Sequence, residues 1–527
     1  MTRIRTAALA PRSQPLHVAA LFIALMAACD CGGSTPQFGA HSQTAGVAQG
    51  DSTTITLSVT NPGGLPLTIE FVSPPAHGTV ALSGTETSPS VIYTPDSAFT
   101  GLDSFTYQAN DGKDTTAAVV TVKVLPAVGP VVPGEDAIDD VLANVLVSQG
   151  MDTAGGVSLA IAKDGQLVYA RGIGYADAPS KTPFAPDALS RIASISKVTT
   201  MAATMHLVES GVLGLDDTLL HWLPEYAGYA TDPRVASITL RHLLSHSAGW
   251  DRDISGDPMF MQGEAAHALG VPSPATCAQV LQWWLGRALD FTPGARHAYS
   301  NFGFCVLSLV VEKASGQDLQ TYVRDVVLAP QGIHDMRFGA SHWADRAPGE
   351  VTYATTSTCA SVFVGDPGSV PCQYGAYSVP TLAGAAAWIG SAVDLTRFID
   401  GLLGHGKDAY LSQSSLEAVS TVTWPEGSYG LGIETGTNDW GTRWRGHFGQ
   451  LDRTLTGAFG MDNGWSYAWI LNAGNLSSST SSVPYYDFNL LVYDAIHDAV
   501  VHTGFTGSPT DLYPSFPSPE LGPYTGT

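Results

Sequence analysis

Hydrophobic and polar residues alternate in short runs along the first part of the chain. Ile55, Leu57 and Val59 alternate with polar neighbours, and the same two-residue period returns near residue 122. Successive side chains of a β-strand point to opposite faces, so this period predicts strands with one buried face. Asn, Pro and Gly residues separate the runs at short intervals, as turns between strands require. The pattern predicts an all-β sandwich over residues 36–124.

A mixed pattern follows over residues 135–505. The apolar runs 157–162 and 167–170 flank the turn residues 163–165, and this arrangement predicts a β-hairpin. Further along, apolar residues recur at helical spacing instead. Strands and helices in one stretch of this length predict a second domain of the α/β (α+β) class.

Two segments are rich in proline. Residues 125–134 hold three prolines and two glycines, which predicts a semi-rigid linker between the domains. Residues 506–527 hold five prolines and have no apolar periodicity, which predicts a disordered tail.

The first 28 residues have the features of a secretory signal. Arg3, Arg5 and Arg12 precede an apolar stretch over 18–28, which as a helix is about 16 Å long and too short to span a membrane. Residues 25–29, Leu-Met-Ala-Ala-Cys, resemble a bacterial lipoprotein box, in which Cys29 is acylated and becomes the mature N-terminus. Met26 departs from that pattern, so secretion without an anchor stays open. We expect an exported protein of the bacterial cell envelope, in the periplasm or at the cell surface.

Composition limits the possible functions. The chain has 527 residues, of which 44% are hydrophobic and 13% charged, so it has material for more than one folded core. Its 24 Lys and Arg against 47 Asp and Glu yield a net charge of -23. Such a balance argues against nucleic acid as a partner and against a polybasic membrane surface.

The cysteines beyond the signal segment predict disulfides, since the protein is expected to be exported. Cys359 and Cys372 are close enough in sequence to close a short loop. Cys277 and Cys305 either form a second bridge or, for Cys305, remain a buried thiol. The histidines are scattered and no Cys-x-x-Cys pair occurs, so neither a metal site nor a cofactor is expected.

Within the predicted sandwich, segments 75–80, 93–95 and 101–107 resemble the cadherin-like, immunoglobulin-type modules of bacterial surface proteins. Three acidic residues there allow two interpretations, calcium ligands or turn residues that face water, and the second is favoured. These residues are Asp103, Asp111 and Asp114.

A serine and a lysine one turn apart are the candidate chemistry. Ser194 precedes Lys197 by three residues, immediately before Met201, Met205 and Val208, whose spacing predicts a helix that stops at Gly211. Residues at i and i+3 share a helix face, so the amine of Lys197 lies beside the hydroxyl of Ser194. A partly desolvated lysine loses its proton near neutral pH and activates such a hydroxyl.

Further motifs follow Ser194 and Lys197 in a fixed order, and together they resemble one known superfamily. The chain is similar to the serine β-lactamase and penicillin-binding-protein superfamily over about 350 residues, most closely to its class C-like branch of esterases, D-aminopeptidases and D,D-peptidases. The motifs are Arg191–Lys197 within 156–226, the segment 238–249, Tyr299-Ser300-Asn301, the segment 380–398 and His447-Phe448-Gly449. The resemblance implies a central antiparallel sheet flanked by helices.

It also implies roles for individual residues. Ser194 is the nucleophile that becomes acylated, and Lys197 and Tyr299 share the acid–base work, with the pKa of the phenol lowered by Lys197. Asn301 binds the acyl side or amide of the substrate, or else it ties two loops together. The backbone N–H groups of Ser194 and Gln450 form the oxyanion hole.

One motif departs from the family pattern. Penicillin-recognising members carry Lys-Thr-Gly where this chain has His447-Phe448-Gly449. A neutral imidazole and an apolar ring replace a permanent cation and a hydroxyl, which favours a smaller or more apolar acyl substrate. His447, Gly449 and Gln450 are therefore predicted to contact the substrate. His242 and His246 also match signature positions and are predicted to fix a turn.

These observations favour a serine hydrolase that cleaves a small-molecule ester, amide or peptide. One alternative is a D,D-carboxypeptidase or β-lactamase that acts on cell-wall amides. Another is an inert adhesion lipoprotein that contacts a cell surface or polysaccharide through its sandwich, although intact Ser194, Lys197 and Tyr299 argue against inertness. Residues 351–380 have no periodicity and predict a long, disulfide-pinned loop, either at the rim of the substrate cleft or remote from it.

Overall fold

The computed structural model describes residues 36–353, 357–405, 409–422, 424, 427–438, 441–474, 492, 494–496 and 505–518. The predicted signal segment 1–28 and the lipidation site Cys29 lie outside the described residues. The chain divides into two compact units, one of residues 1–45 and 52–122 and the other of residues 46–51 and 123–527. In the described ranges, no helix combines the length and the apolar character needed to cross a bilayer.

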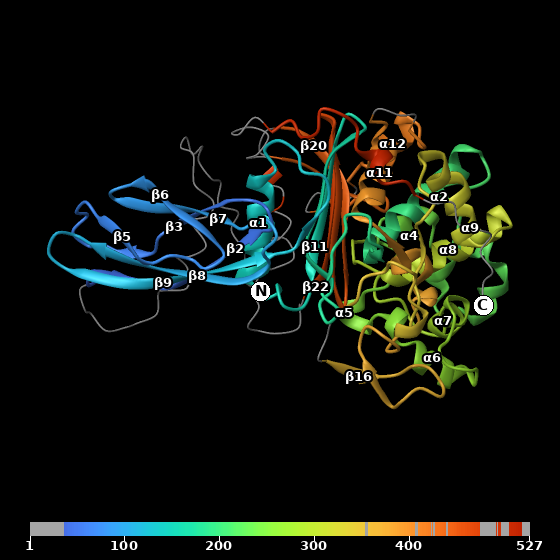
Figure 1. The fold of residues 1–527 in the computed structure, drawn as a ribbon. Coiled ribbons are helices and arrows are strands. Elements are labelled where there is room, and N and C mark those ends of the chain that lie inside the picture. Colours follow the sequence, from blue (N-terminus) through green and yellow to red (C-terminus); the bar gives the residue numbers. More distant parts are fainter. Residues whose placement is uncertain are drawn as a thin grey trace. The chain divides into compact units, whose positions relative to one another are not determined.

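The N-terminal part is the predicted sandwich of antiparallel strands (Figure 1). One sheet has the order β2-β9-β8-β5, a second has the order β3-β7-β6, and β1 pairs with β4. The strands are β1 Gly39–Ala40, β2 Gln43–Ala48, β3 Thr53–Thr56, β4 Val59–Thr60, β5 Thr68–Ser73, β6 Gly78–Thr85, β7 Ser88–Pro95, β8 Gly101–Asn110 and β9 Thr115–Leu125. Alternate residues of β8 and β9 are buried, as the two-residue period predicted.

The acidic residues of the sandwich differ in exposure. Asp111 caps a turn by accepting hydrogen bonds from the backbone N–H groups of Lys113 and Asp114, as a water-facing turn residue does. Asp103 is 6% exposed, so the prediction that it faces water is wrong. Its carboxylate accepts hydrogen bonds from Tyr93 Oη at 2.9 Å and from three backbone N–H groups. These donors lower the pKa of Asp103 against the opposing effect of burial, and they account for its burial without a cation.

The second unit is built on one antiparallel sheet with the order β10-β12-β11-β22-β21-β20-β19, and β13 pairs with β12. The strands are β10 Ala127–Val128, β11 Gly156–Lys163, β12 Gln166–Asp177, β13 Thr182–Pro183, β19 Glu434–Thr437, β20 Arg443–Leu451, β21 Arg453–Met461 and β22 Trp465–Gly474. The predicted hairpin is β11 and β12. In the middle of the sheet Ala160 of β11 stands opposite Ala468 of β22, so the early and late parts of the unit share one sheet.

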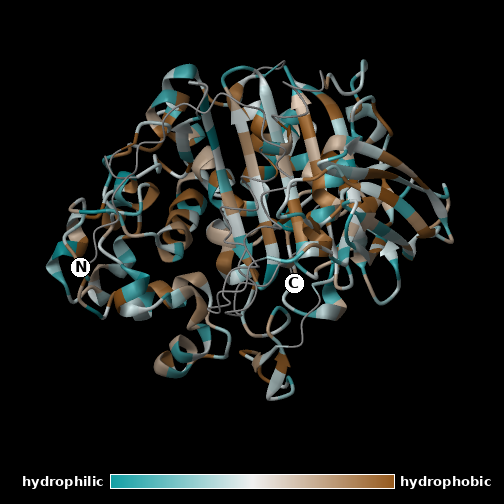
Figure 2. Ribbon diagram, turned by 90° about the vertical axis from the view of Figure 1, so that its left-hand side faces the viewer, coloured by the Kyte–Doolittle hydropathy of each residue, from teal (hydrophilic) through white to brown (hydrophobic). Residues whose placement is uncertain are grey.

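Helices flank this sheet (Figure 1). The helix α1 packs on β12 and β11, whereas α11 packs on β11, β21 and β22, and Figure 1 shows these two helices on opposite faces. Hydrophobic residues recur along the central strands and the helices beside them (Figure 2). The helices are α1 Asp136–Ser148, α2 Ser196–Glu209, α3 Leu219–Trp222, α4 Leu240–Leu244, α5 Arg252–Ser255, α6 Gln262–Leu269, α7 Cys277–Trp284, α8 Asn301–Ser315, α9 Leu319–Val323, α10 Ala383–Ala386, α11 Ala392–Leu403 and α12 Gln413–Val419. The predicted fold class is confirmed.

Two predictions about proline-rich segments are wrong. In the predicted linker, Ala127 and Val128 form β10 and stand opposite Ile173 and Gly172 of β12. Proline tolerates an edge-strand position, so it did not prevent this pairing. In the predicted disordered tail, the described residues 506–518 are packed against other parts of the second unit, and residues 519–527 lie outside the described residues. The Leu512 N–H donates to the Leu167 carbonyl at 2.9 Å, and the hydroxyl of Tyr513 donates to Asp400 at 3.0 Å.

Both predicted cysteine pairs form disulfides. Cys277 of α7 is bonded to Cys305 of α8, with 5.9 Å between their Cα atoms, so the bridge interpretation holds and the free-thiol interpretation is wrong. Cys359 is bonded to Cys372, with 4.8 Å between their Cα atoms. Inside the segment predicted to be a loop, β16 Thr358–Ala360 pairs with β17 Ser369–Pro371, and this second bridge links Cys359 of β16 to the residue that follows β17.

Candidate active site

Ser194 lies in a single helical turn, Ala193–Ile195, that leads directly into α2. Ala193 has φ +49°, a left-handed conformation that is rare for a residue with a side chain. The turn is held against the sheet because Thr456 Oγ1 of β21 donates to the Ile192 carbonyl at 3.0 Å. The prediction that this serine stands at the N-terminus of a helix is therefore correct, and Ser194 lines a cavity.

Lys197 is completely buried on the first turn of α2, beside Ser194. Its Nζ is 3.0 Å from Ser194 Oγ, 2.7 Å from Asn301 Oδ1 and 3.0 Å from the carbonyl oxygen of Ala385. Burial lowers the pKa of Lys197 well below its ordinary value; the nearby cation of Arg252 lowers it further, and Asp257 opposes this change. Burial therefore favours the neutral form of the amine, which has a lone pair with which to accept a proton.

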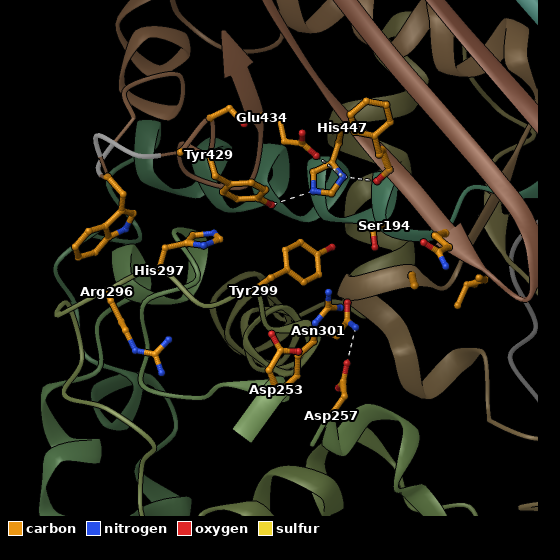
Figure 3. Close-up of a pocket in the computed structure, with 18 of the residues that line it drawn as sticks. Ser194, Asp253, Asp257, Arg296, His297, Tyr299, Asn301, Tyr429, Glu434 and His447 are labelled. Atoms are coloured by element: carbon orange, nitrogen blue, oxygen red, sulfur yellow. Dashed lines mark hydrogen bonds and ion pairs between the residues drawn. The ribbon is translucent and has the colours of Figure 1, made fainter. Parts of the chain in front are cut away.

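Tyr299 lies just before α8, and its hydroxyl points toward Ser194 (Figure 3). The ring centroid is 4.9 Å from Lys197 Nζ. Removal from water raises the pKa of the phenol, while the hydrogen bond with Ser194 and the cation of Arg252 lower it by less. The prediction that Lys197 lowers the pKa of Tyr299 is wrong, because burial has the largest effect and raises this pKa, while the groups that lower it are Ser194 and Arg252. The phenol is therefore protonated at rest, beside an amine whose neutral form is favoured by burial.

Asn301, the first residue of α8, connects Lys197 to a neighbouring turn. Its Oδ1 accepts from Lys197, and its Nδ2 donates to Asp257 Oδ2 at 2.6 Å (Figure 3). The residue is 8% exposed. Asn301 therefore ties α2 to the turn that carries Asp257, which is one of the two roles that the sequence left open. Its contact with a substrate stays a prediction.

His447 lies on β20 at the edge of the same cavity, but both of its nitrogens are engaged. Nε2 is 3.0 Å from the hydroxyl of Tyr429, and Nδ1 contacts the carbonyl oxygen of Phe448 (Figure 3). Since a carbonyl only accepts, the proton is on Nδ1, and Nε2 accepts from Tyr429. Burial and the neighbouring Lys197 lower the pKa of His447 to about 3, so the imidazole is neutral, as predicted.

The two residues that follow His447 have different roles. Phe448 is 4% exposed and its ring packs on Phe459, with 4.7 Å between centroids, so this ring belongs to the core. At Gly449, an added Cβ would lie 2.3 Å from the Ile192 carbonyl oxygen and 2.2 Å from Thr456 Oγ1. Glycine at this position therefore lets β20 approach the turn that carries Ser194.

Two histidines of the signature segment lie behind the site. His242 belongs to the capping box of α4, where its Nδ1 accepts from the Thr239 N–H. His246 is 1% exposed, its Nδ1 accepts from the Ser300 N–H, and its ring lies 4.3 Å from that of Tyr299. Both fix local turns as predicted, and His246 also supports Tyr299.

Ser194 opens into a cavity of about 1400 Å³. The lining residues are Ser194, Arg252, Asp253, Asp257, Phe260, Arg296, His297, Tyr299, Asn301, Ala386, Trp424, Gly427, Ser428, Tyr429, Glu434, His447, Phe448, Gln450 and Leu451. The described part of 351–380 contributes none of them, which favours the staple interpretation over the rim interpretation. The segment meets the lining through Tyr377, whose ring centroid is 5.5 Å from that of Phe260.

Sequence reasoning missed three groups in this cavity: Glu434, Tyr429 and Arg252. Glu434 stands opposite Gly446 in the pairing of β19 with β20, which brings its carboxylate to 3.9 Å from His447 Nδ1. Burial raises the pKa of Glu434 to about 7. Strand register and loop packing place these groups, and neither leaves a motif in the sequence.

One acidic cluster in the described chain has metal-like geometry. The carboxylate oxygens of Asp51, Glu135 and Asp136 lie within 4.8 Å of one another. Arg171 Nη2 lies 3.6 Å from Asp51, 3.8 Å from Glu135 and 2.8 Å from Asp139. A buried guanidinium already pairs with Asp51 and Glu135 of this cluster, and the cluster is outside the cavity lining.

Comparison with known proteins identifies both parts of the chain. The family described as Beta-lactamase matches residues 143–511, and the family described as Bacterial Ig domain matches residues 35–124. Esterase EstB of Burkholderia gladioli is 31% identical over 183 residues, which are 34% of this chain and 45% of the esterase. Penicillin-binding protein 4* of Bacillus subtilis (strain 168) is 29% identical over 178 residues, 33% of this chain and 36% of that protein. The matched region thus spans less than half the length of either relative.

A solved structure agrees with this assignment of the fold. D-amino acid amidase from Ochrobactrum anthropi SV3, complexed with L-phenylalanine amide, has a TM-score of 0.54 and is 22% identical. The alignment covers 71% of this chain and 99% of the amidase chain. At this identity the likeness establishes the fold alone.

Proposed function

The chain belongs to the β-lactamase family of serine hydrolases, and on this basis we propose that it cleaves an ester or amide bond through an acyl-enzyme on Ser194. The observation that carries the proposal is the buried Lys197 amine, 3.0 Å from the Ser194 hydroxyl. A neutral amine has two N–H groups and one lone pair. Its N–H groups donate to Asn301 Oδ1 and the Ala385 carbonyl, so its lone pair accepts the Ser194 proton.

The reaction then runs in two halves. Ser194 Oγ attacks the substrate carbonyl carbon while Lys197 takes its proton, and the oxyanion is bound by the backbone N–H groups of Ser194 and Gln450. Collapse of this intermediate breaks the bond to the leaving group, which receives a proton from Tyr299, and Lys197 returns one to the phenol. Water attacks the acyl-enzyme by the reverse proton transfers and releases the acid.

The residue at the position of the family's substrate-binding cation favours esters and simple amides over penicillins as substrates. The position that carries a permanent cation in penicillin-recognising relatives is occupied here by His447, whose neutral imidazole is held by Tyr429. A D,D-carboxypeptidase or β-lactamase remains the alternative, and rates on short-chain esters, D-amino-acid amides and a chromogenic cephalosporin distinguish the two.

Labelling with a serine-reactive phosphonate tests the proposal. We expect one adduct, on the tryptic peptide that contains Ser194, and no adduct in Ser194→Ala. Ser196→Ala is the matched control, because Ser196 lies on the same turn but its Oγ accepts from the Trp388 N–H instead. An adduct that persists in Ser194→Ala, or that disappears in Ser196→Ala with the fold intact, contradicts the assignment.

The place of action is also a proposal. We propose export, with lipid attached at Cys29, which rests on the arginines, the apolar stretch and the Cys within the first 29 residues. The bacterial Ig domain then serves as a contact to the cell surface or a polysaccharide. Labelled palmitate should enter the wild-type protein and not Cys29→Ala; incorporation into both contradicts the anchor.

A further inference from the structure

Arg252 brings a permanent positive charge to the catalytic tyrosine. It is the first residue of the short helix α5, it lines the cavity, and its side chain is exposed. The guanidinium carbon lies 4.8 Å from the centroid of the Tyr299 ring, within stacking distance. This cation also lowers the pKa of both Tyr299 and Lys197, which confirms that it is close to the reacting groups.

In the described part of the chain, no ion pair and no hydrogen bond joins the guanidinium of Arg252 to another group. Arg296, the other arginine of the lining, differs in this respect, because its Nη2 is 2.6 Å from Asp251 Oδ2. Asp257 is engaged by Asn301, and Asp253 lines the cavity without an ion pair to Arg252.

Two other basic groups beside Ser194 are less suited to bind an anion. Burial lowers the pKa of Lys197 well below its ordinary value, and both nitrogens of His447 are engaged by protein groups. Among the described residues, a substrate anion that enters the cavity therefore meets Arg252 as a cation without an ion pair, whereas Arg296 is paired with Asp251. Guanidinium binds carboxylate through two parallel N–H···O bonds, which fix the orientation of the anion.

We propose that Arg252 is a specificity-determining residue that binds a carboxylate on the leaving-group side of the substrate. The leaving-group side follows from its position over Tyr299, the group that faces the departing atom in the proposed function, on which this inference rests. Arg252 thereby supplies the positive charge that the His447-Phe448-Gly449 strand lacks. A charge-assisted bidentate pair in a partly open cavity is worth about 10- to 100-fold in kcat/KM.

Two matched esters test the inference. The acetyl ester of 3-hydroxybenzoate carries the carboxylate on its leaving group, and the acetyl ester of 3-hydroxybenzamide is its neutral counterpart. In Arg252→Gln, kcat/KM for the carboxylate ester should fall about 10- to 100-fold relative to the neutral ester, mainly through KM. Arg252→Lys should keep part of the preference. Arg287→Gln is the control for loss of one charge, because Arg287 stacks on Trp283 outside the cavity lining.

Several results overturn the inference. One is an equal loss on both esters in Arg252→Gln, which makes Arg252 an electrostatic aid to Tyr299 and not a specificity residue. Another is a loss confined to an ester whose carboxylate is on the acyl side. If the variant does not fold, the wild-type protein still tests the inference. Its preference for the carboxylate ester over the neutral ester must weaken as salt rises from about 0.02 to about 0.5 M, and a constant preference refutes the proposal.

A separate measurement distinguishes failure of this inference from failure of the proposed function. Free 3-hydroxybenzoate should slow phosphonate labelling of Ser194 at lower concentration than 3-hydroxybenzamide does, and Arg252→Gln should remove this difference. Labelling that is normal but equally protected by both compounds refutes the role of Arg252 alone. Absence of labelling in the wild type refutes the proposed function.

Discussion

Asp257→Asn should move the acid limb of the pH–rate profile to lower pH. Asp257 accepts from Asn301 at 2.6 Å, and Asn301 in turn accepts from Lys197 at 2.7 Å. Its negative charge favours the ammonium form of Lys197 and so raises the pKa of that amine. Because only the neutral amine accepts the Ser194 proton, activity rises with pH through the pKa of Lys197. Removal of the charge lowers this pKa, and the amine is neutral over a wider range.

The size of this shift follows from the separation of the charges. Two unit charges on either side of one bridging amide, at an effective dielectric of about 20, interact by about 3 kcal/mol. Water and salt in the open cavity reduce this interaction to about 1.4 kcal/mol, which is about tenfold in an equilibrium constant. On the acid limb, where the rate is proportional to the neutral fraction, Asp257→Asn should be about tenfold faster than the wild type at the same pH.

The assay is kcat/KM on an uncharged ester from pH 5 to pH 10, so that the substrate does not titrate. Asp253→Asn removes the same charge from the same cavity lining, yet Asp253 does not contribute to the pKa shift of Lys197, so its profile should move less. Thermal unfolding checks that the loss of the hydrogen bond from the Met259 N–H to Asp257 leaves the fold intact. An acid limb that moves to higher pH, or that moves equally in both variants, refutes Lys197 as the neutral base.

Four further predictions follow from individual contacts. Tyr299→Phe should keep the fold and lower turnover by about 10²- to 10⁴-fold, and an unchanged rate would mean that Lys197 acts alone. Gly449→Ala should abolish phosphonate labelling, because its Cβ meets the Ile192 carbonyl at 2.3 Å; full labelling would show that the turn can move. Cys359→Ser with Cys372→Ser should lower the melting temperature and leave the ratios of kcat/KM between substrates unchanged; altered ratios would show that this segment shapes the cleft. Deletion of residues 36–127 should leave labelling intact but lower the melting temperature of the second unit, since it removes β10 and the Asp51 partner of Arg171; an unchanged melting temperature contradicts this.

Sequence reasoning succeeded where the chemistry depends on local spacing. Ser194 and Lys197 are one helical turn apart, so their contact follows from helix geometry once the helix is recognised. The hairpin of β11 and β12 follows equally from two apolar runs around a short turn. The ordered motifs up to His447 added residues far apart in the chain, and the structure brings Ser194, Tyr299, Asn301 and His447 to one cavity.

Reasoning from composition failed where packing decides the outcome. The proline-rich end was predicted to be disordered, but Leu512 and Tyr513 are buried against the second unit and its backbone is hydrogen-bonded there. Phe448 was predicted to make the substrate site more apolar, yet β20 directs its ring onto Phe459. In each case a neighbour distant in sequence determines what the side chain contacts.

The sequence by itself determined the family, the two-part organisation and the proposed nucleophile with its proposed base, because these depend on residue type, order and spacing. Only the tertiary structure decided the direction of each pKa change and the place of Arg252 in the cavity. A pKa depends on burial and on charges that distant segments supply, as Asp257 and Arg252 do for Lys197. The position of Arg252 over Tyr299 depends on how a loop packs against α8, and no spacing along the chain encodes that contact.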